Sequence, residues 1–86
     1  MMRRSPTDNQ ATLLRQLLAE LRRERKIHQA DLARSLNKPQ SFVSKYEIGE
    51  RKLDFVEVIN ICGALNKNPH ELIDEFMEIT TRLKLK

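Results

Sequence analysis

Apolar residues recur along the chain at intervals of three and four, the spacing that places side chains on one face of an α-helix. The first stripe contains five leucines between Leu13 and Leu21 and predicts a long helix with a wide apolar face. Shorter stripes follow, bounded by residues that favour turns or helix caps. The pattern predicts an all-α fold of five helices. The first four are expected over residues 7–25, 29–36, 40 to 46 or 47, and 54–65, and the fifth begins at Pro69 and continues its apolar face to Leu83.

The second and third predicted helices are separated by only three residues, Asn37, Lys38 and Pro39. A sharp turn after a helix needs a residue with positive φ, and asparagine adopts that conformation at low cost. Proline suits the first position of the next helix, because that position needs no backbone N–H. Gly49 is expected to end the third helix, and Asn66 the fourth. Two short helices joined by a tight turn are typical of a helix-turn-helix, whose second helix enters the major groove of DNA.

The third predicted helix has one apolar and one polar face. Val43 and Tyr46 lie three residues apart and are expected to point toward the core, with Phe42 on the flank. The opposite face is short, polar and uncharged apart from one lysine, so its side chains can reach base edges without repelling phosphates. The residues of this outward face are Gln40, Ser41, Ser44 and Lys45.

The segment from Gln29 to Asp54, QADLARSLNKPQSFVSKYEIGERKLD, resembles the lambda-repressor-like family of DNA-binding domains, which includes the Cro and xenobiotic-response-element (XRE) proteins. The resemblance extends over about residues 17–73. It implies a five-helix domain whose helix-turn-helix, formed by helices 2 and 3, binds double-stranded DNA. Two positions depart from the family pattern, because Asn37 replaces the usual turn glycine and His28 the usual capping threonine. Helix geometry accommodates both residues.

The resemblance also implies roles for individual side chains. Residues along the third helix read bases, and a glutamine at its start suits a bidentate contact with adenine. Polar and basic residues on either side of that helix contact phosphates, and an ion pair joins the first helix to the end of the third. The expected base-reading residues are Gln40, Ser41, Ser44 and Lys45, the phosphate-binding residues are Gln29, Lys38, Arg51 and Lys52, and the ion pair is Arg22 with Glu47.

Charge is unevenly distributed along the chain, whose formal net charge is +4. Residues 22–52 contain nine Lys or Arg against four Asp or Glu, a net charge of +5. Residues 53–86 contain four bases against six acids, a net charge of −2. The basic block coincides with the predicted helix-turn-helix, which is where phosphates would lie. A solvated surface without a ligand is the alternative explanation of this cluster.

The single cysteine, the length of the apolar runs and the isolated histidines argue against a secreted protein, a membrane protein and an enzyme. Cys62 is the only cysteine and cannot form an internal disulfide, so we expect a cytoplasmic protein in which Cys62 is a core residue. No apolar run approaches the roughly 20 residues of a membrane span, and the N-terminal MMRRSPTDNQ lacks the apolar core of a secretory signal. His28 and His70 are isolated, so we expect no enzyme, no metal site and no cofactor.

We expect a single domain, because 86 residues supply one small core. Its expected parts are a flexible arm over residues 1–6, the DNA-binding domain over residues 7–73, and an extension of the last helix over residues 74–86.

The fourth and fifth predicted helices are expected to complete the core. Asp54 and Glu57 have the spacing of a capping box at the start of the fourth helix, and Asn68 with Pro69 suits the cap and first position of the fifth. The apolar residues between Phe55 and Leu65 predict a largely buried fourth helix. Gly63 lowers helix stability, which predicts that it packs closely against a neighbouring helix. Leu72 and Ile73 of the fifth helix are expected to close the core.

The last predicted helix carries more apolar residues than a five-helix core needs. Exposed apolar side chains at helical spacing mark a contact surface, so they predict either a homodimer interface or packing within the subunit. These residues are Phe76, Met77, Ile79 and Leu83. A homodimer would bind a palindromic operator, as we expect of a repressor. The alternative is an antitoxin-like module that binds a partner protein, a toxin, as well as DNA.

Overall fold

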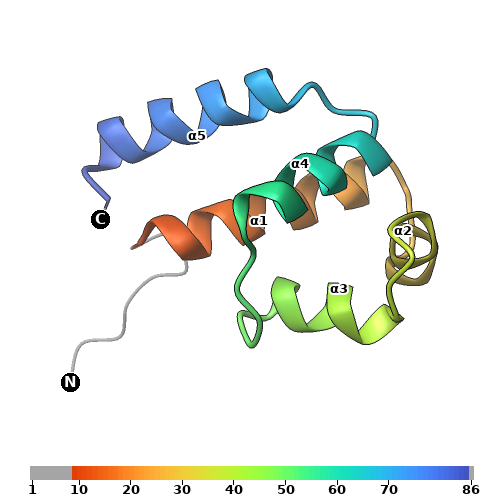
Figure 1. The fold of residues 1–86 in the computed structure, drawn as a ribbon. Coiled ribbons are helices and arrows are strands. Elements are labelled where there is room, and N and C mark those ends of the chain that lie inside the picture. The colour runs from red at the N-terminus through yellow and green to blue at the C-terminus, as the bar shows by residue number, and fades with distance from the viewer. Residues whose placement is uncertain (1–8, 86) are drawn as a thin grey trace.

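The computed structural model describes residues 9–85, which form five helices joined by short loops (Figure 1). The helices are α1 (Gln10–Glu24), α2 (Gln29–Ser35), α3 (Gln40–Glu47), α4 (Phe55–Ala64) and α5 (Pro69–Leu83). No strand occurs among residues 9–85, which confirms the predicted all-α fold. None of the helices described is long and apolar enough to cross a membrane. The predicted arm, residues 1–6, lies outside the described range.

α1 begins at Gln10, later than the position 7 that the apolar pattern predicts. The reason is a local cap: the side chain of Asn9 accepts a hydrogen bond of 2.8 Å from the backbone N–H of Thr12. Such a cap satisfies one of the N–H groups that the first turn leaves without a helical partner. The helix therefore starts where a capping side chain is available.

Each of the five helices is followed by a residue with positive φ. Asn37 and Asn66 have φ values of 57° and 58°, which confirms the two asparagine turns predicted from the sequence. Gly49 follows α3 with φ of 88°, where glycine is unstrained. Pro39 differs from its predicted place, because it is the N-cap of α3 and Gln40 is the first helical residue. Its extended backbone, with φ of −70° and ψ of 155°, redirects the chain between α2 and α3.

α4 and α5 start with the caps that the sequence predicts. The Asp54 carboxylate accepts a 2.7 Å bond from the Glu57 N–H, and the Glu57 carboxylate accepts a 2.9 Å bond from the Asp54 N–H, which completes a capping box. The Asn68 side chain accepts a 2.8 Å bond from the His70 N–H, and Pro69 occupies the first helical position of α5. Both starts are local features, which is why the sequence reveals them.

The core is a single cluster to which all five helices contribute. Leu32 of α2 and Leu72 of α5 are both buried in it. Cys62 of α4 is completely buried, and burial raises the pKa of its thiol, so it behaves as a small core residue rather than a nucleophile. The largest fully buried side chains are Tyr46, Leu18, Leu32, Ile61, Leu65, Val43 and Cys62.

α4 is less buried than its composition predicts. The buried residues of α4 are Val58, Ile61 and Cys62, which lie on one face of the helix. Phe55 in the first turn is 69% exposed, so its predicted burial is wrong. Gly63 has no close neighbour, since an added Cβ would meet no atom within 4 Å, and the predicted close helix packing is also wrong.

α5 packs against α1 and α4 of the same chain (Figure 1). Leu72 and Thr80 are buried on this side, and the Gln10 Nε2 group donates a 3.2 Å hydrogen bond to the Leu85 carbonyl. Ile73 lies at the edge and is exposed, so it does not close the core as predicted. Of the four apolar residues singled out in the sequence, two are partly buried and two are exposed. The partly buried pair is Phe76 and Ile79, and the exposed pair is Met77 and Leu83.

Candidate nucleic-acid interface

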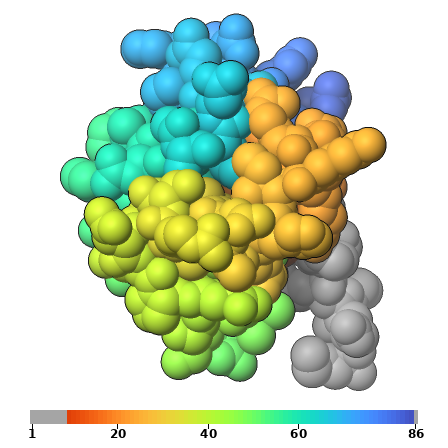
Figure 2. All heavy atoms as spheres, turned by 90° about the vertical axis from the view of Figure 1, so that its right-hand side faces the viewer, coloured from red at the N-terminus to blue at the C-terminus, as the bar shows by residue number. Residues whose placement is uncertain are grey.

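α2 and α3 form one compact helix-turn-helix unit. The turn is closed by a 2.9 Å hydrogen bond from the Lys38 N–H to the Ala33 carbonyl, the pattern of a helix that ends in a left-handed residue. Ala33 of α2 and Phe42 and Val43 of α3 anchor the unit in the core. Figure 2 shows the side chains of α2 and α3 as one continuous surface, with α3 directly below α2.

The outward face of α3 is polar and open to solvent. Gln40, Ser41 and Lys45 are exposed, and Ser44 is partly exposed. The Ser44 hydroxyl donates a 3.3 Å hydrogen bond to the Ser41 carbonyl one turn earlier, so it remains close to the helix surface. The structure thus places the four residues expected to read bases on one accessible face.

A largely buried ion pair connects α1 to the end of α3. The Arg22 Nε group donates to Glu47 Oε2 at 2.7 Å and Nη2 donates to Oε1 at 3.0 Å, a bidentate geometry. The two side chains are 11% and 5% exposed, respectively. Arg22 Nη1 also donates to the Ile27 carbonyl at 2.8 Å, which ties the α1–α2 loop to the same pair. The hydrogen bond to Glu47 raises the pKa of the Arg22 guanidinium, so Arg22 remains charged.

Two glutamines extend this ion pair to the start of α3. Gln29 Nε2 donates to Glu47 Oε1 at 2.8 Å, and Gln40 Nε2 lies 3.5 Å from Gln29 Oε1, at the limit of a hydrogen bond. Arg22, Glu47, Gln29 and Gln40 therefore form a continuous polar network from α1 to the first residue of α3. The network holds both ends of α3 relative to α1 and α2.

The loop between α3 and α4 is held by Arg51. Its Nη1 and Nη2 groups donate to the two carboxylate oxygens of Glu57 at 3.0 and 2.8 Å, and Nη1 also donates to the Lys52 carbonyl at 2.6 Å. The guanidinium lies 4.7 Å from the centre of the Phe42 ring, within the range of a cation–π contact. These contacts lower the pKa of Glu57, chiefly through the hydrogen bonds from Arg51. Lys52 and Lys45 remain exposed.

Comparison with known proteins agrees with this geometry. A family model described as helix-turn-helix matches residues 18–72, more than half of the chain. A solved XRE-family like protein from Pseudomonas syringae pv. tomato str. DC3000 is 38% identical, with a TM-score of 0.79 over 83% of this chain and 87% of that chain. The chain belongs to the XRE family of helix-turn-helix proteins. Membership confirms the resemblance seen in the sequence and makes the chain a DNA-binding regulator.

A second solved structure supports the XRE fold of the chain. The wild-type restriction-modification controller protein C.Esp1396I is 19% identical and superimposes with a TM-score of 0.74, over 80% of this chain and 91% of that chain. At this level of identity the likeness concerns the fold alone. No curated protein matches the chain significantly in sequence.

Two residues at the C-terminal end of α3 in this XRE-family fold were not predicted from the sequence. Arg15 Nη1 donates to the Glu47 carbonyl at 3.3 Å, and its guanidinium packs over Gly49, so it caps the C-terminal end of α3. Arg15 lies two helical turns before Arg22 on the same face of α1. This spacing indicates that Arg15, like Arg22, faces the end of α3. The other missed residue is Ile48, which is 64% exposed at the end of α3.

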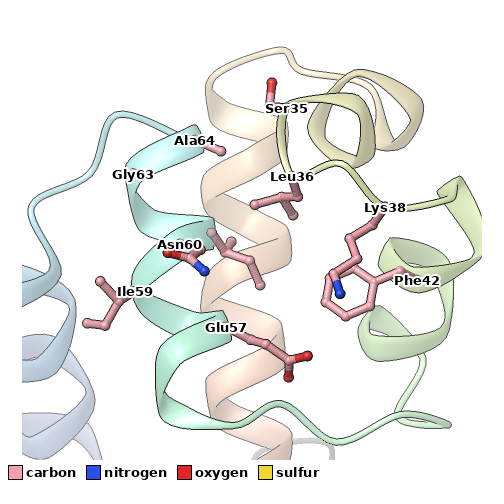
Figure 3. A pocket seen from close by; sticks show the side chains of 10 residues that line it. Ser35, Leu36, Lys38, Phe42, Glu57, Ile59, Asn60, Gly63 and Ala64 are labelled. Atoms are coloured by element: carbon pink, nitrogen blue, oxygen red, sulfur yellow. The ribbon is translucent and has the colours of Figure 1, made fainter.

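A groove of about 640 Å³ lies between α4 and the helix-turn-helix. Figure 3 shows the Lys38 ammonium against the Phe42 ring on one wall, with Glu57 and Asn60 of α4 opposite them. The Lys38 Nζ atom is 5.5 Å from the ring centre. The groove contains no group of metal-ligating side chains, and none occurs elsewhere in residues 9–85. We assign no ligand to it.

Proposed function

We propose that this XRE-family regulator binds a palindromic operator as a homodimer and represses transcription there. The observation that carries the proposal is the exposed polar face of α3, which buried contacts from α1 and α2 hold in place. Sequence readout requires side chains presented in a fixed geometry, because each base-edge hydrogen bond is directional. A regulator that occupies a promoter in this way represses by excluding polymerase.

The side chains of α3 supply the readout in this proposal. Gln40 contacts an adenine through its amide, with Gln29 fixing the orientation of that amide. Ser41 donates or accepts at a base edge, since a hydroxyl does both, and Ser44, whose proton is donated to the Ser41 carbonyl, accepts at a neighbouring base edge. Lys45, one turn beyond Ser41, contacts a guanine or a flanking phosphate.

Residues on either side of α3 supply the phosphate contacts. On the α2 side, Gln29 uses one N–H of its amide for Glu47, and the second N–H is free to reach a phosphate. Lys38 in the turn is exposed, and its ammonium lies beside the same Phe42 ring that the Arg51 guanidinium contacts. On the other side, Lys52 is exposed, and Arg51 keeps 41% of its side chain accessible while three hydrogen bonds hold it to Glu57 and Lys52. A guanidinium has five N–H donors, so Arg51 can bind a phosphate without releasing Glu57.

The surface we propose for dimerisation joins α5 to the start of α4. An apolar groove of about 240 Å³ runs between α1, α4 and α5, with Phe76 among its lining residues. Phe55 and Ile73 line this groove and are exposed, and Met77 is exposed one helical turn after Ile73 on α5. Contiguous exposed apolar side chains mark an association surface, and a projecting phenyl ring beside an apolar groove is self-complementary under two-fold symmetry. Phe76 and Met77 of the predicted interface belong to this surface, and Ile79 and Leu83 continue it along α5.

The dimensions of the protomer suit a symmetric dimer on DNA. The described chain measures 37 × 30 × 22 Å. If two protomers lie side by side along the 37 Å or the 30 Å dimension, their centres are separated by about 37 or 30 Å. One turn of DNA, which separates two half-sites, is roughly 34 Å. The dimer can therefore place one α3 in each of two successive major grooves on the same face of the duplex.

Selection of duplexes from a random library tests the DNA-binding part of the proposal. We expect enrichment of a palindrome, with half-sites about 10 base pairs apart centre to centre. Gln40→Ala is expected to relax the preference at one or two base pairs per half-site, a loss of about 1–3 kcal/mol at those positions alone. The proposal is wrong if no duplex is retained at low salt, or if Gln40→Ala weakens binding to every sequence equally.

Sizing by light scattering tests the dimer surface. Wild-type protein is expected to be a dimer, and Phe55→Asp a monomer that remains helical, because Phe55 is exposed in the subunit. Ile48→Asp is the matched control, since Ile48 is an equally exposed apolar residue outside the proposed surface. Identical masses for wild type and Phe55→Asp would contradict this surface.

The second candidate function is the antitoxin-like one, in which the same XRE-family chain also binds a partner protein. The observation that favours it is the same exposed apolar surface, flanked on α5 by the acidic residues Glu71, Asp74, Glu75 and Glu78. A small, basic toxin encoded beside this gene would fit such a surface. Co-expression with the neighbouring reading frame distinguishes the homodimeric repressor from the antitoxin-like module. If the second function holds, the two chains are purified as a complex, and Phe55→Asp disrupts that complex.

A further inference from the structure

Ile48 continues the DNA-facing side of α3 by one further turn. Its backbone N–H donates to the Ser44 carbonyl at 3.2 Å, and its φ of −95° and ψ of 2° keep it close to the helical path. With 3.6 residues per turn, Gln40, Ser44 and Ile48 follow one another along the helix surface, and Ile48 falls between Ser44 and Ser41 around the axis. Ile48 thus lies within the arc of side chains that the proposed function assigns to base readout.

The side chain of Ile48 is apolar and 64% exposed, with no described role in the core. An apolar side chain in this arc can make no hydrogen bond to a base edge. The apolar group that base pairs present in the major groove is the 5-methyl of thymine. The deoxyribose of the backbone is the other apolar surface within reach of a recognition helix.

We infer that Ile48 is a specificity-determining residue that packs against a thymine methyl group in each half-site. The inference rests on the proposed function, since it needs α3 to lie in the major groove. The polar residues of α3 then select bases by hydrogen bonding, and Ile48 adds a preference for thymine by excluding water from its methyl group. Removing a methyl from such a contact lowers the affinity by about fourfold per half-site.

The test uses a duplex selected by the wild-type protein from a random library. Each thymine of that duplex is replaced in turn by deoxyuridine, which removes the 5-methyl group and preserves every hydrogen-bonding group. Dissociation constants are measured for wild type, Ile48→Ala and Ile48→Val. Ile48→Val is the matched control, because it keeps a branched apolar side chain in the same position.

At one thymine per half-site, deoxyuridine is expected to weaken wild-type binding about fourfold and Ile48→Val binding by a similar factor. Ile48→Ala is expected to bind the two duplexes equally, and to bind the thymine duplex as weakly as wild type binds the deoxyuridine duplex. The inference is overturned if no position shows this difference, or if Ile48→Ala loses the same affinity on selected and random duplexes, as a sugar contact predicts. Failure to enrich any duplex contradicts the proposed function itself, and the inference with it.

Discussion

Replacing Glu47 by alanine removes the carboxylate on which three hydrogen bonds converge, two from Arg22 and one from Gln29. Both members of the ion pair are largely shielded from water, with side-chain exposures of 11% and 5%. Glu47→Ala therefore leaves a shielded guanidinium without its counter-charge. Breaking a buried pair in this way costs about 3–5 kcal/mol. The total stability of a domain of this size is about 4–13 kcal/mol, so the loss is a large fraction of it.

Urea denaturation, monitored by circular dichroism, measures this loss of stability. We expect the midpoint for Glu47→Ala to fall well below that of wild type with a similar m-value, because the exposed surface on unfolding changes little. Asp31→Ala is the matched control, since it also removes a carboxylate from an arginine. The Arg34–Asp31 pair has side-chain exposures of 75% and 50%, so its loss is expected to cost less than about 1 kcal/mol.

Two further variants separate burial of charge from loss of packing. Glu47→Gln keeps an acceptor for Arg22 and Gln29 but removes the charge, and is expected to unfold between wild type and Glu47→Ala. Replacing Arg22 by methionine together with Glu47 by leucine is expected to recover much of the loss, because no unpaired charge remains. Equal midpoints for Glu47→Ala and Asp31→Ala would refute the argument that shielding makes the Arg22–Glu47 pair the stronger determinant.

Three other predictions concern stability. Gly63→Ala is expected to raise the free energy of unfolding by roughly 0.5–1 kcal/mol in urea melts, because α4 gains helix propensity and the methyl meets no atom within 4 Å. Asn37→Ala is expected to lower the free energy of unfolding by about 1 kcal/mol, because φ is 57° at this position and alanine is strained there. Asn37→Gly is expected to leave the free energy of unfolding unchanged or to raise it, because glycine adopts positive φ without strain. The Glu57 carboxyl is expected to titrate below its ordinary pKa of 4.5 in NMR experiments, and to return toward it in Arg51→Ala. Because the folded-state pKa is lowered, the stability from this pair is complete above the unfolded-state pKa and is lost as pH falls through the folded-state value.

The features predicted well from the sequence are those that depend on nearby residues. The turn at Asn37, the capping box of Asp54 and Glu57, and the Asn68–Pro69 start of α5 each involve residues at most three positions apart. Such signals act through backbone conformation and orphan N–H groups, so they can be found without knowing the fold. The outward face of α3 also followed from the local pattern, because only one side of that helix is apolar.

The predictions that failed depend on where helices lie relative to one another. The composition of α4 cannot show which of its apolar sides the other helices cover, and so Phe55 was wrongly expected to be buried. Close packing at Gly63 was inferred from the unfavourable helix propensity of glycine, but propensity does not identify a neighbour. The capping role of Arg15 needed the end of α3 to lie beside α1, a contact between residues 32 positions apart.

The position of α3 cannot come from α3 itself. A helix of eight residues is too short to be stable alone, since isolated helices below about 12–15 residues are marginal in water. Its apolar side chains fix its depth in the core but leave rotation and sliding weakly defined, because apolar contacts are not directional. The directional contacts are made at its ends: Gln40 meets Gln29 at the start, and Glu47 meets Arg22 and Arg15 at the other end. In the proposed function the polar network therefore orients α3 already in the free protein. It fixes the helix axis along which Gln40, Ser44 and Ile48 are presented to the DNA.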